Sequence, residues 1–301
     1  MDIESRLYHY GLGAGIPYAA LNSIANAFDA ARYAPELARR RKVARDLLAG
    51  SPWKGFVPQD TGYAIVGPET LPHTAEMLQA VRDIIEDRRK TGWRARKNNP
   101  FYQLERAEDF RNYPAIMKFV LSEAMLHIAS DYYGMVPQLK EVGIWLTPPQ
   151  DHQFSSQLYH LDKPESRLLK LFINVDANDN NSGPLTLLPA NISSVVRSKT
   201  GYEAVYFRGD GRLTDNAVFA HCSPSDQIAL GGSAGCGGFA DTSSCFHYGS
   251  RTKSGERKMF TVAFMLPHKA RESRTPLFDL VPEPQDEVRR LVLSGAQFAR
   301  N

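Results

Sequence analysis

The sequence has few cysteines, no long apolar run and no strong excess of either charge. Only three of its 301 residues are cysteine, an odd number without CxxC spacing, which predicts neither a disulfide framework nor a structural zinc site. The formal net charge of +3 gives no general argument for nucleic acid or an anionic membrane as a partner. No stretch reaches the roughly 18 uninterrupted apolar residues of a membrane helix. The N-terminus has acids and no apolar run, so no secretory signal is predicted, and the scarce cysteines favour a cytoplasmic setting.

The first 135 residues carry helical patterns. An Ala-rich stretch over 19–48 is interrupted by Pro35, which should break or restart its helix. Apolar residues at the spacing of one helix face predict further helices over Thr74–Lys90 and Pro114–Tyr133, the second of which Gly134 would end.

The second half is rich in short β-type runs between Gly, Pro, Asn and Asp clusters. The predicted strands are Val142–Thr147, Leu168–Val175, Leu185–Leu188, Gln227–Leu230, Gly238–Asp241, Cys245–Tyr248 and Met259–Leu266. No long helices alternate with these strands, so a parallel α/β sheet is not expected. We predict a mainly β fold with α-helices, in which the N-terminal helices buttress an antiparallel sandwich or barrel.

The candidate chemistry begins with Tyr159-His160-Leu161-Asp162. In an extended segment, residues two apart point to the same face, so His160 and Asp162 would project side by side. One imidazole and one carboxylate are two of the three groups in the 2-His-1-carboxylate set that holds non-haem Fe(II). His247, in a separate β-type run, is the candidate third ligand.

Arg257 follows His247 at the start of the last strong strand. A guanidinium in that place could bind a carboxylate through two parallel hydrogen bonds. The alternative is a solvated residue within the charged run Lys253–Lys258, and Arg251 is a competitor for the same role or for a substrate anion.

Together these motifs resemble the phytanoyl-CoA dioxygenase family of Fe(II)/2-oxoglutarate-dependent oxygenases. The resemblance covers roughly residues 110–268 and rests on Tyr159–Asp162, on Asn181–Pro189, which is similar to the family's "NGPL…LPGSH" hairpin, on Phe246–Ser250 and on Arg257. Residues 1–70 match no pattern of the family.

The resemblance implies a double-stranded β-helix, the cupin-like jelly roll. It implies that His160, Asp162 and His247 are the catalytic iron ligands and that Arg257 binds the distal carboxylate of 2-oxoglutarate. Thr147 would be a further contact to 2-oxoglutarate. The second cosubstrate would be O2. We therefore expect one domain over 1–301, with a mainly helical part (1–135), a jelly-roll catalytic core (136–270) and a C-terminal helix or tail (271–301).

The sequence departs from the family pattern at two points. It has His247-Tyr248-Gly249-Ser250 where the family usually has His-Gly-Ser, which puts the place of Ser250 near the cosubstrate in question. The hairpin also ends without the usual Gly-Ser-His. Asp162 keeps the carboxylate that related halogenases replace by a small residue, which favours hydroxylation or desaturation.

The predicted protein is an oxidoreductase, a dioxygenase that oxidises an unactivated C–H of a small organic molecule while 2-oxoglutarate becomes succinate. An alternative is the same chemistry on a nucleic-acid base, suggested by the basic runs Arg39–Lys42 and Arg88–Lys97, although nearby acids make solvated helix ends the simpler explanation. The other alternative is a catalytically silent jelly roll that binds a ligand. No membrane partner is expected.

Several other features have simpler structural explanations. His127 fits a packed helix residue, and the three cysteines fit buried or incidental thiols better than a zinc site. Gly231–Gly238 lacks the lysine of a P-loop and is expected to form a barrel loop or substrate lid. Asp151 and His152 would point to opposite faces of a strand, which argues against them as an iron pair.

Overall fold

The computed structural model describes residues 10–11, 13–16, 18–92, 101–149, 153–162, 167–269 and 286–294. Its α-helices are α2 (Tyr18–Arg32), α3 (Ala34–Leu47), α4 (Thr74–Lys90), α5 (Ala107–Asn112), α6 (Pro114–Val120), α7 (Glu123–Tyr133), α8 (Ala190–Thr200), α9 (Tyr202–Arg208), α10 (Asp215–Phe219) and α11 (Glu287–Leu293). Its strands are β1 (Tyr63–Val66), β2 (Tyr102–Gln103), β3 (Gln138–Thr147), β4 (Leu168–Asn174), β5 (Thr186–Leu187), β6 (Ile228–Ala229), β7 (Gly237–Asp241), β8 (His247–Tyr248) and β9 (Arg257–Met265).

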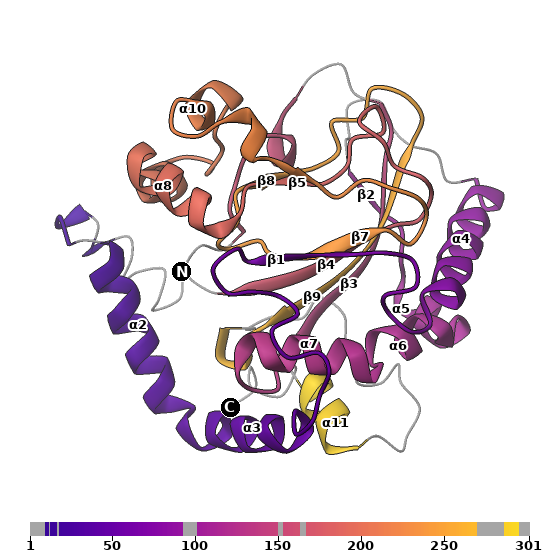
Figure 1. The fold of residues 1–301 in the computed structure, drawn as a ribbon, viewed down its shortest axis with the longest axis horizontal. Helices are drawn as coiled ribbons and strands as arrows, with labels where there is room; N and C mark the ends of the chain where they lie inside the picture. The colour runs from indigo at the N-terminus through magenta and orange to yellow at the C-terminus, as the bar shows by residue number, and fades with distance from the viewer. Residues whose placement is uncertain are drawn as a thin grey trace.

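Two antiparallel sheets lie against each other (Figure 1). The larger has the strand order β1-β7-β4-β9-β3-β2, and the smaller has the order β6-β5-β8. The central strand β9 pairs with β3 from Gln138↔Met265 to Thr147↔Arg257 and with β4 on its other side. A larger and a smaller antiparallel sheet in this arrangement form a double-stranded β-helix, so the predicted jelly roll is confirmed.

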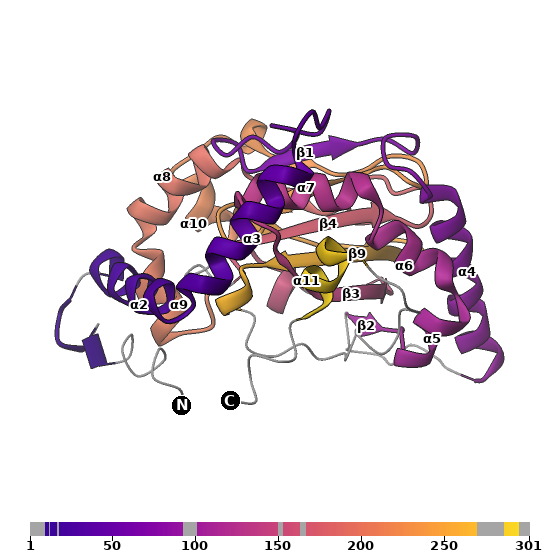
Figure 2. The ribbon, with the colours of Figure 1, turned by 90° about the horizontal axis from the view of Figure 1, so that it is seen from below.

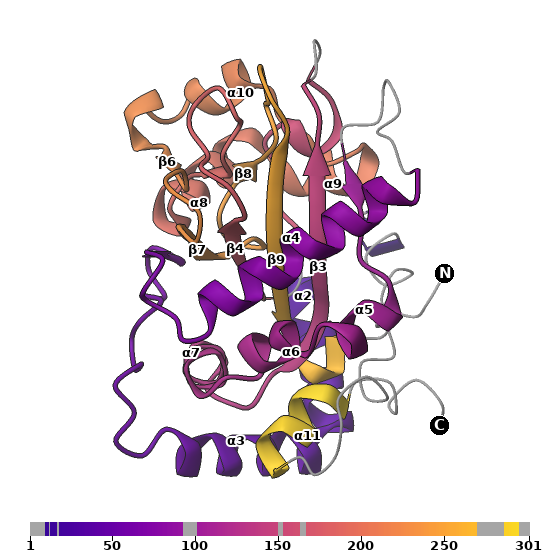
Figure 3. The same ribbon diagram turned by 90° about the vertical axis from the view of Figure 1, so that its right-hand side faces the viewer.

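Helices cover the outer face of the larger sheet. Figure 3 shows α4 and α6 across this face, and Figure 2 shows α3 and α11 beside it. The strands present alternate apolar residues to these helices, among them Leu169 and Leu171 of β4 and Phe260 of β9, and all three are fully buried. The ring of Phe119 from α6 packs edge-on against Phe260, with ring centroids 5.9 Å apart. This layer is the main hydrophobic core.

A second hydrophobic cluster packs against α8, α9 and α10, and Figure 1 shows α8 and α10 beside the smaller sheet. We call it the α8–α10 cluster, and its buried members are Tyr159, Leu161, Leu188, Val196, Tyr202, Leu213, Val218 and Phe246. It flanks the segments that carry His160 and His247, so these three helices support the candidate site directly.

The predicted helices agree with the structure, with one break. The helix over Thr74–Lys90 is confirmed as α4, and the interruption near Pro35 separates α2 from α3. The helix predicted over Pro114–Tyr133 is instead two helices, because Ser122 takes an extended backbone conformation (φ −65°, ψ 153°) between α6 and α7. Gly134 ends α7 with φ +65°, in the left-handed region that suits glycine.

All seven predicted strand regions contain a strand, several shorter than predicted. Two strands, β1 and β2, lie before residue 136, where only helices were predicted. β1 pairs with β7 at one edge of the larger sheet, and β2 pairs with β3 at the other. Both are short edge strands that owe their conformation to pairing with distant segments, which a local pattern does not show.

The glycine-rich segment 231–238 serves packing within the barrel. A Cβ at Gly237 would lie 1.9 Å from the backbone oxygen of Phe172, so β7 can approach β4 this closely only with glycine there. No helix follows the segment; it leads directly into β7. Among the described helices, none is both long and apolar enough to cross a membrane.

Candidate active site

Two segments that are distant in the sequence bring two histidines and one carboxylate together. His160 lies in a short extended segment that forms an isolated antiparallel bridge with His247 of β8, through backbone N–H···O contacts of 3.0 and 3.1 Å. The backbone N–H of Asp162 donates to the carbonyl of Thr242 at 2.7 Å. The distant segments predicted to meet are therefore neighbours in the fold.

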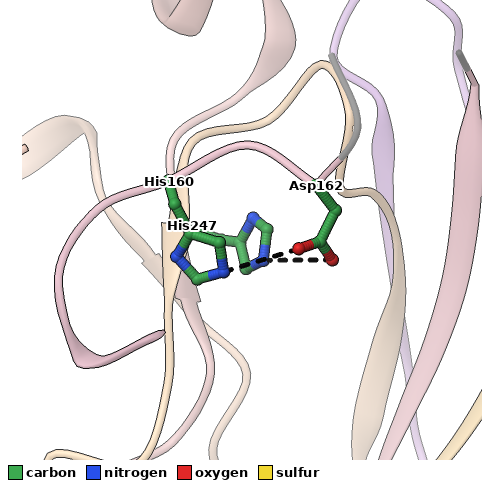
Figure 4. A group of neighbouring side chains, drawn as sticks. All are labelled: His160, Asp162 and His247. Atoms are coloured by element: carbon green, nitrogen blue, oxygen red, sulfur yellow. Dashed lines mark ion pairs between the residues drawn. The ribbon is translucent and has the colours of Figure 1, made fainter. Parts of the chain in front are cut away.

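The three side chains converge (Figure 4). His160 Nε2 lies 3.6 Å from Asp162 Oδ1, and His247 Nε2 lies 3.7 Å from Asp162 Oδ2. One potential ligand atom from each residue lies within 4.8 Å of the other two. Among the residues that the structure describes, this is the one group of three or more His, Cys, Asp or Glu side chains with such spacing.

Backbone carbonyls fix the orientation of both imidazoles. His160 Nδ1 lies 2.9 Å from the oxygen of Leu158, and His247 Nδ1 lies 3.0 Å from the oxygen of Cys245. Because a carbonyl only accepts hydrogen bonds, each Nδ1 must carry the proton, which leaves the Nε2 lone pairs free and directed toward Asp162. Metal-binding histidines are typically held in this way. The donor set therefore fits a transition-metal ion such as Fe(II).

Burial keeps the two imidazoles neutral. Each histidine is only 4% exposed. Desolvation, aided by the neighbouring His247 and opposed by Asp162, lowers the pKa of His160 to about 3. Desolvation also lowers the pKa of His247. Neutral imidazole is the form that binds a metal ion, so both rings are ready to act as ligands at neutral pH.

Lys170 of β4 neutralises the carboxylate. Its Nζ lies 2.7 Å from Asp162 Oδ2. Burial by itself would raise the pKa of Asp162, but the ammonium of Lys170 outweighs it and holds the pKa well below its usual value. Asp162 is therefore ionised, with Oδ2 occupied by the lysine and Oδ1 available.

A polar cluster lies at the ends of β3 and β9. Thr147 and Arg257 are cross-strand partners, and both are buried. Ser250 lies between them: its hydroxyl accepts a hydrogen bond from Arg257 Nη1 at 2.5 Å and one from Thr147 Oγ1 at 3.1 Å. The structure thus places Ser250 beside Arg257 despite the longer loop, with a left-handed backbone (φ +65°) at the serine.

The guanidinium of Arg257 has unused hydrogen-bonding capacity. Its Nε is buried without a hydrogen-bond partner, and Arg257 has no acidic partner among the described residues. Burial lowers the pKa of Arg257 to about 10, which leaves it charged at neutral pH. A buried, charged and incompletely paired guanidinium is costly on its own and fits the carboxylate of a bound molecule.

Arg251, the competing arginine, is already engaged. Its two terminal nitrogens contact both oxygens of Asp215 at 2.7 and 2.8 Å, and its Nε donates to the backbone oxygen of Gln157. The guanidinium also lies 3.4 Å from the ring centroid of Tyr248. Arg251 therefore fixes α10 to the smaller sheet and is not free to bind a second carboxylate.

The remaining sequence features take structural places. His127 is buried and its Nδ1 lies 2.7 Å from Ser51 Oγ. Two members of the basic runs are buried, since Arg40 binds Glu36 and backbone oxygens, and Arg88 pairs with Asp109. The cysteines are free thiols. Asp151, His152 and 93–97 lie outside the described residues.

Two important residues escaped the sequence-based prediction. Lys170 lies between Leu169 and Leu171 in β4. A lysine on the face opposite to these two leucines was the signal in the sequence that could have identified it. Tyr202 was in a region without a motif; its hydroxyl accepts from the N–H of Leu161, beside His160, and donates to the oxygen of Gly211.

Comparisons with known proteins concern the fold. No family model matches the sequence, and no curated protein matches it. A crystal structure of EctD from S. alaskensis in its apoform is similar, with a TM-score of 0.50 and 13% identity over 70% of this chain and 75% of that one. The non-heme alpha-ketoglutarate-dependent carbocyclase SnoK from nogalamycin biosynthesis matches with a TM-score of 0.47 and 17% identity over 72% and 84% of the two chains.

A further match is EvdO2 from Micromonospora carbonacea var. aurantiaca, complexed with 2-oxoglutarate, with a TM-score of 0.44 and 18% identity over 69% of this chain and 87% of that one. At these identities the likeness extends to the fold alone. What the site does must be argued from its own residues.

Proposed function

We propose that this protein is an Fe(II)/2-oxoglutarate-dependent oxygenase, related to the phytanoyl-CoA dioxygenase family, that oxidises an unactivated C–H of a small organic molecule. Two groups of side chains carry the proposal. The first is the set His160, Asp162 and His247, with both Nε2 atoms facing the carboxylate. The second is Arg257, a buried cation without an acidic partner among the described residues.

The two groups match the two requirements of this chemistry. Three protein ligands on one side of an ion leave the other positions open for a cosubstrate and O2. When bound, Fe(II) would supply O2 activation coupled to the decarboxylation of 2-oxoglutarate to succinate and CO2. Arg257 would bind the distal carboxylate of 2-oxoglutarate, with Ser250 and Thr147 holding the guanidinium in place.

The protein's own contribution is orientation and exclusion of water. The carbonyls of Leu158 and Cys245 hold the imidazoles in the tautomer that leaves Nε2 without a proton. Lys170 holds one oxygen of Asp162, so the carboxylate is presented through the other. Burial of both histidines limits access of bulk water to a reactive centre.

A catalytically silent jelly roll explains these features less well. Two buried neutral imidazoles, an ionised carboxylate and an incompletely paired guanidinium all cost folding free energy. A ligand-binding shell would not need an ion-ligating set beside such a cation. One arginine of each basic run, Arg40 and Arg88, is buried in the fold and so does not contribute to a nucleic-acid surface.

The test is an anaerobic titration of the metal-free protein with Fe(II) and then 2-oxoglutarate, followed by visible absorption. We expect the weak charge-transfer band of the iron–2-oxoglutarate chelate. His160→Ala should abolish it. Arg257→Ala should require about ten- to a hundredfold more 2-oxoglutarate, as expected for a lost charged hydrogen-bonding partner. Arg41→Ala, an exposed arginine of α3, is the matched control and should behave as wild type. A wild-type protein that binds no iron and forms no band would sink the proposal.

A further inference from the structure

A third arginine, Arg212, is held next to His160 by the backbone. Tyr159 and Leu213 exchange two backbone hydrogen bonds, of 3.1 and 2.8 Å, in an isolated antiparallel bridge. On the other side of Arg212, the Tyr202 hydroxyl joins the oxygen of Gly211 to the N–H of Leu161. The residues before and after Arg212 are thus tied to the residues after and before His160, so the two are opposite each other.

The direction of the Arg212 side chain follows from its neighbours. Tyr159 and Leu213 both pack into the α8–α10 cluster. In paired extended segments, adjacent residues point to opposite faces, so Arg212 points to the same side as His160, toward the metal-ligand set.

Arg212 differs from the other cations around the site in what it binds. Lys170 is paired with Asp162, Arg251 with Asp215, and Arg257 hydrogen-bonds Ser250. Within the parts of the chain that the structure describes, the half-buried side chain of Arg212 forms no ion pair or hydrogen bond; only its backbone N–H does, to Asp210.

Arg212 and Arg257 reach the site from different elements. Arg257 begins β9 of the larger sheet, whereas Arg212 comes from the segment between α9 and α10, beyond His160 at the edge of the smaller sheet. One guanidinium therefore serves the cosubstrate in the proposed reaction, and the other is left for a different anion.

We propose that Arg212 binds an anionic group of the primary substrate, a carboxylate or a phosphate, beside the metal-ligand set. The proposal rests on the proposed function and names its substrate class, a small organic acid or phosphate ester. A planar guanidinium can bind either group through two parallel hydrogen bonds. Such a contact would fix the substrate at one end and leave a C–H at some distance from the anion to face the site.

The test measures anion binding without metal. Isothermal titration calorimetry would use the metal-free full chain in an Arg257→Gln background, so that the cosubstrate arginine does not contribute. The probes are benzoate, phenyl phosphate and neutral benzyl alcohol. We expect at least one anion to bind more tightly than the alcohol, and Arg212→Gln to weaken it about tenfold or more, as for other charged hydrogen bonds. The tighter anion then identifies carboxylate or phosphate.

Two further variants complete the design. Arg212→Lys should keep part of the anion affinity, and Arg41→Gln should keep all of it, while thermal unfolding shows whether each variant is folded. Equal anion binding with and without Arg212, or no binding of either anion, would overturn the proposal. Because these titrations contain no metal, they can fail while the iron titration succeeds, and the reverse also holds.

Discussion

The two faces of the larger sheet are made by the same strands, and both bury apolar residues, but buried charged side chains of β4 and β9 lie on the inner face. On the outer face, β4 places Leu169 and Leu171, and β9 places Phe260, against a layer of helices. On the inner face, the same strands carry Lys170 and Arg257 toward the site. Two arginines buried elsewhere, Arg40 and Arg88, each have an acidic partner, whereas Arg257 has none among the described residues. The outer face therefore contributes apolar packing alone at these positions, whereas the inner face combines apolar packing, as at Phe172 and Met259, with buried charge that has a cost in stability.

The largest expected effect tests the outer face. Phe260→Ala should lower the free energy of unfolding by about 3–5 kcal/mol, because it leaves a cavity in the main core. Chemical denaturation measures this loss. The affinity of the folded variant for 2-oxoglutarate should change little, and Phe28→Ala, at a ring that is 59% exposed, should leave stability nearly unchanged. A large loss of cosubstrate affinity in Phe260→Ala would show that the two faces are not independent.

Lys170→Met tests the inner face. In the metal-free protein it should cost about 2–3 kcal/mol, because it leaves the ionised Asp162 without its cation in a mostly buried site. A divalent ion should restore part of this loss, since it takes over the charge of the lysine. Adding Mn²⁺ should therefore increase the unfolding temperature more in the variant than in wild type.

Lys258→Met is the matched control for Lys170→Met. Lys258 of β9 pairs at 2.6 Å with Asp176, which lies just after β4 and is not one of the three ligands. The stability lost in Lys258→Met should not be restored by Mn²⁺. If Mn²⁺ stabilises both variants equally, Lys170 has no special relation to the metal-ligand set.

A pH series tests the two buried histidines. The pKa of His160 is near 3 in the folded protein and ordinarily 6.5, so between these values the unfolded chain binds a proton that the folded chain does not. Unfolding is therefore favoured as the pH falls, by about 1.4 kcal/mol per pH unit for this histidine. Denaturation of the metal-free protein between pH 6.5 and 4.5 should show this slope, and His160→Asn should reduce it. An unchanged slope in His160→Asn would contradict the lowered pKa of His160 in the folded protein.

The smallest expected effect is at Arg257, and a second buried arginine, Arg88, serves as its comparison. Arg257→Met should change the stability of the metal-free protein by less than about 1 kcal/mol in either direction, because it removes a cation whose burial is not repaid by an acidic partner. Arg88→Met should cost about 3 kcal/mol or more, because it leaves Asp109 buried without its partner. Denaturation curves give the free energy of unfolding of the two variants. Similar losses of stability in both would show that Arg257 has a structural role.

The helices and strands could be predicted from the sequence where their residue pattern is local. The helix over Thr74–Lys90 has one continuous apolar face and was predicted with its bounds. The break at Ser122 was not, because the apolar spacing continues through it. β1 was missed because its four residues become a strand only through pairing with β7.

The candidate site was predictable to the extent that it is written in motifs. His160, Asp162 and His247 were chosen from spacing, and the structure brings them together. The position of Ser250 could not be fixed from the sequence, because its left-handed backbone sets how the longer loop folds back to Arg257. Arg212 has no motif at all, since its place depends on the bridge between Tyr159 and Leu213.

The α8–α10 cluster also links the three ligands unequally to the rest of the molecule. Tyr159 and Leu161 on either side of His160, and Phe246 beside His247, are all members of the cluster, whereas Asp162 is tied to Lys170 in the larger sheet. Opening of the cluster would release both imidazoles in a single event and leave the carboxylate behind. The lifetime of a bound ion would then equal the waiting time for that opening, and a strong chelator would remove the ion at a rate independent of the chelator's concentration.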